Sequence, residues 1–142
     1  MTSVERIEER VLALLLEGRG EILSALQKQI ASLRVKERKL TGVGFITEFV
    51  NVDSNGRLPE NPTFTLGDVS AKINGLQNGA GFVLFVRDGY INTLEGYTYD
   101  EPWPECITEF DVFYSHGKRD EETLIKSIED EIALHRSSSR VH

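Results

Sequence analysis

The sequence is poor in residues that form covalent or metal cross-links. Its 142 residues include a single cysteine, Cys106, which excludes an internal disulfide and a cysteine-based zinc cluster. The three histidines, His116, His135 and His142, are scattered and form no His-x-x-x-His pair. We therefore expect no metal and no cofactor. Because Cys106 precedes apolar Ile107, we also expect its thiol to be packed in the core.

The chain also lacks long apolar runs and an excess of positive charge. No run approaches the roughly 20 residues that cross a membrane, and the formal net charge is −7. This charge argues against binding to nucleic acid or to an anionic membrane surface. The first residues include Glu5, Glu8 and Glu9 and lack the layout of a signal peptide. These absences predict a cytoplasmic protein, and its acidity permits a basic protein partner.

What the sequence does contain is a strong hairpin signal. Asp88-Gly89 separates two apolar runs, residues 82–86 and 91–95, and Asp-Gly favours a type I′ turn. Counting outward from this turn predicts the cross-strand pairs Arg87 with Tyr90, Val86 with Ile91, Phe85 with Asn92, Leu84 with Thr93, Val83 with Leu94 and Phe82 with Glu95. The first strand is apolar on both faces, so we expect it to be central and covered on both sides.

Residues 3–39 have the periodicity of helices. Thr2 and Glu5 form a capping box, and apolar residues recur at spacings of three and four on both sides of Gly18-Arg19-Gly20. Two glycines cost about 2 kcal/mol in a helix interior, so we predict a helix pair, with one kinked helix as the alternative. The basic run at residues 34–39 is expected to be the last turn of the second helix, because cations there interact favourably with the helix dipole.

From Val43 onward the period changes to two. Residues 43–52, 63–73 and 107–114 are predicted strands that flank the hairpin, and the acidic side of 107–114 indicates an edge strand. Asp120 is the expected N-cap of a final helix at 120–136, followed by a loose tail at 137–142. The short connections predict a single α+β domain over residues 1–142. Its sheet, residues 43–114, would have about five antiparallel strands in a meander, with the N-terminal helix pair and the C-terminal helix packed on it.

The segment at residues 94–105 has the highest density of functional groups. Three aromatic residues and four carboxylates surround one glycine and two prolines, and a rigid loop that displays Tyr and Trp is typical of a recognition surface. With the hairpin tip included, the candidate binding residues are Arg87, Tyr90, Glu95, Tyr97, Tyr99, Asp100, Glu101, Trp103 and Glu105. The alternative is that Tyr97 and Trp103 fold back as a lid on the core. No catalytic residue is predicted, because the carboxylates have no defined separation and no nucleophile motif is present.

The block from Gly81 to Pro104 consists of an apolar strand, an Asp-Gly turn, a strand ending in Leu-Glu-Gly-Tyr-Thr-Tyr, and Trp-Pro. It resembles a pattern in small bacterial proteins that have no assigned activity. Some acidic bacterial proteins of this size and layout are immunity proteins encoded beside secreted toxins. The resemblance covers about a sixth of the chain. It implies a bacterial cytoplasmic origin, no known enzyme activity and no catalytic residue.

These features together predict a non-enzymatic cytoplasmic protein-binding module, such as an immunity protein. The aromatic residues would anchor a basic partner, and the acidic residues would steer it. Two alternatives stay open. One is a small-molecule-binding protein or hydrolase with a pocket lined by Glu95 and Asp100. The other is a homodimer built on the N-terminal helices.

Overall fold

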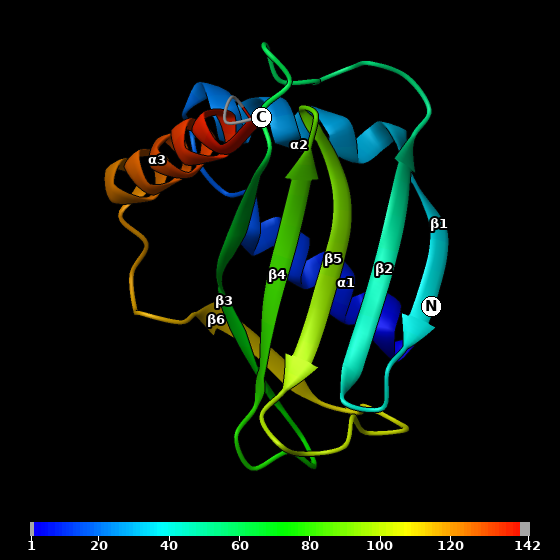
Figure 1. Cartoon of the computed structure of the whole chain (residues 1–142). Coiled ribbons are helices and arrows are strands. Elements are labelled where there is room, and N and C mark those ends of the chain that lie inside the picture. Colours follow the sequence, from blue (N-terminus) through cyan, green and yellow to red (C-terminus); the bar gives the residue numbers. More distant parts are fainter. Residues whose placement is uncertain (1, 140–142) are drawn as a thin grey trace.

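The computed structural model describes residues 2–139 and shows helices packed on one face of a six-stranded antiparallel sheet (Figure 1). The elements, in chain order, are α1 (Ser3–Leu15), α2 (Glu21–Gln29), the 3-10 helix η1 (Ile30–Ser32), β1 (Leu33–Leu40), β2 (Gly44–Asn51), β3 (Phe64–Ile73), β4 (Ala80–Arg87), β5 (Tyr90–Thr98), β6 (Phe110–Tyr114) and α3 (Glu121–Ser139). The α+β class and the helix pair are confirmed. Thr2 caps α1, accepting a hydrogen bond from the Glu5 amide at 3.2 Å.

The strand order is β1-β2-β5-β4-β3-β6. The predicted meander is therefore wrong, because β2 pairs with β5 instead of β3. Residues 52–63 cross one end of the sheet to reach β3, and the β4–β5 hairpin lies between β2 and β3 (Figure 1). This order places β4, the most apolar strand, at the centre of the sheet, where burial stabilises it most.

The clearest difference from the sequence prediction is β1. The basic run at residues 34–39 forms a sheet edge paired with β2, so the sheet spans residues 33–114 and the helical region ends at Ser32. Lysine, arginine and glutamate favour helices, but pairing with β2 outweighs that preference here. The pairing also brings the Arg38 guanidinium onto Glu8 of α1, with N–O distances of 2.6 and 3.0 Å.

The central hairpin turns at Asp88-Gly89 as predicted, and both residues have positive φ. The predicted pairs Arg87–Tyr90 and Val86–Ile91 are confirmed. Beyond them Asn92 is an extra residue, so the remaining pairs are shifted by one and Leu84 faces Leu94. The bulge moves Leu94 onto the buried face, which leaves Glu95 and Tyr97 on the other face.

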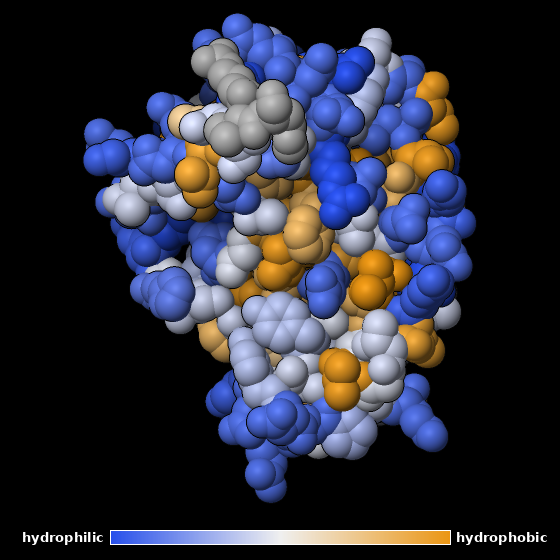
Figure 2. Space-filling model, viewed as in Figure 1, coloured by the Kyte–Doolittle hydropathy of each residue, from blue (hydrophilic) through white to orange (hydrophobic). Residues whose placement is uncertain are grey.

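The hydrophobic core lies between the sheet and the two N-terminal helices. Fully buried core residues include Ile7, Val11 and Leu15 of α1, Leu23 and Leu26 of α2, and Phe45, Phe82, Leu84 and Leu94 of the sheet. The opposite face, which we call the open face, has no helix over β4. Val83 and Phe85 there are only half-buried, so the expected cover on both sides is wrong. Figure 2 views this face and shows an apolar patch ringed by hydrophilic residues.

On the side of the sheet opposite β1, two elements lie beside β3. β6 is an edge strand as predicted, although it begins at Phe110 and pairs only with Val69–Ile73 of β3. Beside the rest of β3 lies α3, whose Glu131 accepts a hydrogen bond from the Thr65 hydroxyl at 3.0 Å. Asp120 caps α3 as expected. The helix continues through residues 137–139, so the tail is not loose there, and residues 140–142 lie outside the described residues.

Candidate interaction surface

Tyr97 and Tyr99 stand on the open face above Gly81. Tyr97 is the cross-strand partner of Gly81, and a Cβ on that glycine would lie 2.6 Å from the Tyr97 ring. The absence of a side chain at Gly81 therefore lets the Tyr97 ring lie across β4. Tyr99 packs edge-on against Tyr97, with ring centroids 5.6 Å apart, and is 46% exposed. Burial raises the pKa of Tyr97, and the neighbouring Tyr99 and Glu95 raise it further.

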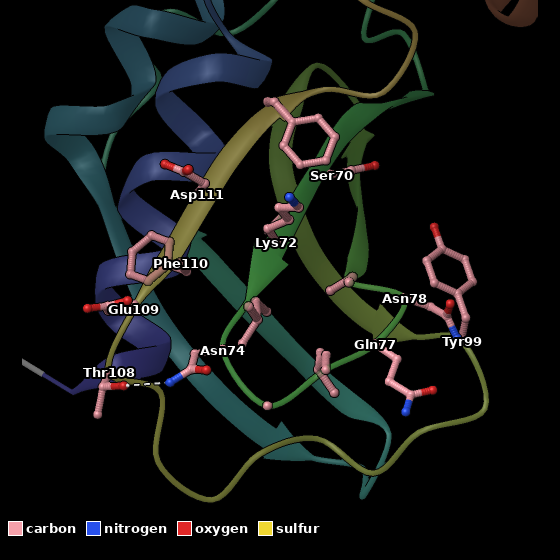
Figure 3. Close-up of a pocket in the computed structure, with 17 residues that line it drawn as sticks. Ser70, Lys72, Asn74, Gln77, Asn78, Tyr99, Thr108, Glu109, Phe110 and Asp111 are labelled. Atoms are coloured by element: carbon pink, nitrogen blue, oxygen red, sulfur yellow. Dashed lines mark hydrogen bonds between the residues drawn. The ribbon is translucent and has the colours of Figure 1, made fainter.

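Tyr99 lines an open groove of about 1070 Å³ at one end of the open face (Figure 3). Ser70 and Lys72 of β3 form its floor. Asp111 and Phe113 of β6 lie on the side away from Tyr99, and the β3–β4 turn closes the end. Phe113 is 43% exposed. The groove therefore presents one aromatic side chain from the segment that follows β5 and one from β6 across a polar floor.

Glu101 fixes the wall of this groove. Its carboxylate accepts hydrogen bonds from the backbone amides of Gln77 and Asn78, at 2.8 and 3.0 Å. The Thr98 hydroxyl contacts both the carbonyl of Glu101 and that of Val43. Glu101 was predicted as a binding residue, and in the structure its carboxylate connects the β3–β4 turn to the segment that follows β5.

Trp103 packs against the open end of the core. Its ring meets Phe45 edge-on with centroids 5.4 Å apart, and its backbone amide donates to the Gly42 carbonyl at 2.8 Å. Phe45 needs the space above Gly96, because a Cβ there would lie 2.4 Å from its ring. Trp103 thus occupies the lid position given above as the alternative, whereas Tyr97 lies on the open face.

The other predicted site residues do not gather at the groove. Arg87 and Tyr90 lie at the opposite end of the β4–β5 hairpin, about 25 Å away at 3.3 Å per residue. There the Arg57 guanidinium lies 4.6 Å from the centre of the Tyr90 ring. Glu95 is half-buried on the open face, and Asp100 and Glu105 are exposed in the connection to β6. Cys106 is exposed too, which corrects the packed thiol expected there.

One side of the groove comes from a part of the chain that has no basic residues, whereas its floor and end come from residues 70–80. Residues 88–117 contain no lysine or arginine. They contain seven carboxylates: Asp88, Glu95, Asp100, Glu101, Glu105, Glu109 and Asp111. Glu109 and Asp111 line the groove, and Lys72 on its floor comes from β3. This stretch of 30 residues without lysine or arginine can be recognised from the sequence alone.

Among residues 2–139, no group of three or more His, Cys, Asp or Glu side chains is placed to hold a metal ion. In the same part of the chain no helix is long and apolar enough to cross a membrane. Comparison with known proteins gave no match, either to a protein-family model, to a curated protein or to a solved structure.

Proposed function

We propose that this chain is a non-enzymatic protein-binding module whose open-face groove contacts a basic partner. The observation that carries the proposal is the placement of Tyr99 and Phe113 across a groove that Glu109 and Asp111 also line. Each of the two aromatic side chains is more than two-fifths exposed. Exposed aromatic side chains at a concave site are typical anchors of protein interfaces. The surrounding carboxylates would accelerate encounter with a positively charged surface.

An immunity protein that occludes a secreted bacterial toxin fits this chemistry. Such a protein needs a complementary surface and no catalytic group, and it would act in the cytoplasm. Support comes from the net charge of −7, from Glu109 and Asp111 at the groove and from the sequence resemblance of residues 81–104. The basic surface of the toxin would meet Glu109 and Asp111, and its apolar groups would pack on Tyr99 and Phe113.

The small-molecule or hydrolase alternative has less support. It requires a pocket lined by Glu95 and Asp100, but the large groove is open and lined by Glu109 and Asp111. The homodimer alternative retains one observation in its favour. A groove of about 730 Å³ beside α1 is lined by Leu12, Ala13, Leu14, Leu16 and Ile30, together with Glu9, Arg10, Glu17 and Gln27. Light scattering of the pure protein tests it, and a monomer would dismiss it.

Affinity capture from a lysate of the source organism tests the main proposal. Three baits are compared: the natural chain, the double variant Tyr99→Ala/Phe113→Ala, and Leu134→Ala, which removes a side chain 69% exposed on α3. We expect the natural and Leu134→Ala baits to recover the same basic protein, more strongly at low salt than at moderate salt. The double variant should lose it while keeping its melting temperature, because both aromatic residues are exposed.

Equal recovery by all three baits would contradict the assignment to the groove. Recovery of the bait alone would contradict a protein partner. In that case a shift in melting temperature with candidate small ligands would test the remaining alternative.

A further inference from the structure

The outer edge of β1 is the least protected part of the sheet. β1 is eight residues long and lies at the end of the strand order, so no segment of residues 2–139 pairs with its outer side. The opposite edge differs, because short β6 and α3 divide the length of β3 between them. An unpaired strand edge presents backbone amides and carbonyls that can pair with another extended chain.

The side chains of β1 divide into two rows. Arg34, Glu37 and Lys39 share the open face, opposite Val50, Glu48 and Ile46 of β2. On the helix face, Arg38 is engaged by Glu8. The other two residues of that row that project to solvent are Val35, 47% exposed, and Leu40, 69% exposed. The edge therefore has Arg34 and Lys39 on either side of Glu37 on one face, and exposed apolar side chains on the other.

We propose that β1 binds an extended acidic segment of another protein by strand addition. Acidic side chains on one face of that segment would meet Arg34 and Lys39, and apolar side chains on its other face would cover Val35 and Leu40. Lys36 strengthens the preference, since its only partner in the described chain is a largely exposed Glu48 at 3.8 Å. The proposed binding site is separate from the open-face groove and does not depend on it.

A second copy of β1 is a poor occupant of this edge. Two paired copies would bring together two strands that each carry four basic residues and one acidic residue, and like charges on adjacent strands are destabilising. Lysines on an edge strand can also serve only to prevent pairing. If the lysines only prevent pairing, no peptide binds to β1, whatever its charge. If β1 binds by strand addition, an acidic peptide does bind, so a peptide probe distinguishes the two explanations.

The probe is a fluorescein-labelled octapeptide, Val-Glu-Val-Glu-Thr-Glu-Val-Glu, with blocked ends. Its binding is measured by anisotropy at about 0.15 M salt, where distant charges are screened. We expect the acidic peptide to bind and to slow amide hydrogen exchange in residues 33–40. The same peptide with lysine for glutamate, and the acidic peptide with alternate amides N-methylated, should not bind. Lys36→Glu/Lys39→Glu should weaken binding roughly tenfold or more. The control Lys118→Glu/Lys126→Glu, which makes the same change in net charge at exposed positions, should not.

Several results would overturn the proposal. Failure of the acidic peptide to bind would show that the lysines only protect the edge. Undiminished binding of the N-methylated peptide would show that charge alone is recognised. An equal loss in the control variant would exclude a local site. A dimer that light scattering detects, and that Lys36→Glu/Lys39→Glu dissociates, would mean that β1 pairs with itself. Tyr99→Ala/Phe113→Ala should leave peptide binding intact, which separates this proposal from the groove.

Discussion

Replacing Gln29 by a residue of similar shape should lower the stability of the fold considerably. It ends α2 and is fully buried. Its side-chain nitrogen donates to the carbonyls of Gly56 and Gly89, both at 2.9 Å, and its side-chain oxygen accepts from the Ile91 amide at 2.8 Å. One amide group thus joins α2, the β2–β3 crossover and the central hairpin.

The variant Gln29→Met keeps the length of the side chain and removes all three hydrogen bonds. It leaves the Ile91 amide and the Gly56 carbonyl without their partner, whereas the Gly89 carbonyl still accepts from Leu58 at 3.1 Å. Each buried group left unpaired costs about 1–3 kcal/mol, so we expect a loss of about 3 kcal/mol in the free energy of unfolding. For a chain of this size, that loss corresponds to a drop of about 6–12 °C in melting temperature.

Urea denaturation measures this loss, with thermal unfolding as a second assay. The matched control is Gln77→Met, the same chemical change at an exposed side chain in the β3–β4 turn. It should alter stability by less than about 0.5 kcal/mol. If Gln29→Met cost no more than the control, the three hydrogen bonds would not contribute as reasoned here.

Two further predictions concern contacts that α1 makes with the sheet. Glu8→Ala should lower the free energy of unfolding by about 3 kcal/mol, because the mostly buried Arg38 guanidinium loses its charged partner. Replacing both Glu8 and Arg38 with leucine should lower the free energy of unfolding by less than Glu8→Ala does, as measured by urea denaturation. An equal or larger loss in the double variant would contradict this reasoning. Burial, reinforced by Glu17, raises the pKa of Tyr114 to about 12. Folding thus favours the protonated Tyr114 hydroxyl. The stability that this hydroxyl contributes is fully present below pH 10 and is lost as the pH rises through 12. Tyr114→Phe should flatten that decline and remove the last phase of the ultraviolet titration of tyrosine; persistence of that phase would refute the assignment.

Local signals in the sequence predicted local structure well. The Asp88-Gly89 turn, the Thr2 and Asp120 caps and the break near Gly18 each depend on a few adjacent residues, and all are confirmed. Strand β1 was missed because its charged residues favour a helix in isolation. Its pairing is set by β2, and Arg38 meets a carboxylate 30 residues earlier in the chain. No window of sequence contains that information.

The hairpin register shows the same limit in finer detail. Strict alternation would have placed Glu95 opposite Phe82 on the buried face, and the bulge at Asn92 prevents this. Side chains distant in sequence support the strand beside the bulge. Gln29 accepts a hydrogen bond from the Ile91 amide, and Asn51 donates to the Ile91 carbonyl at 3.1 Å. For the candidate site, the sequence indicated Tyr99 but not Phe113, which reaches the groove only because β6 pairs with β3.

The insertion of β5 between β2 and β3 has a consequence for how the chain could be divided. A cut within residues 52–63 would give one piece with α1, α2, β1 and β2 and a second with the remaining strands and α3. Neither piece would hold the whole core, since α1 and α2 cover strands that belong to the second piece. The two pieces would meet along the β2–β5 seam and at Gln29. The chain is therefore a natural candidate for a split reporter whose halves regain structure only on reassembly.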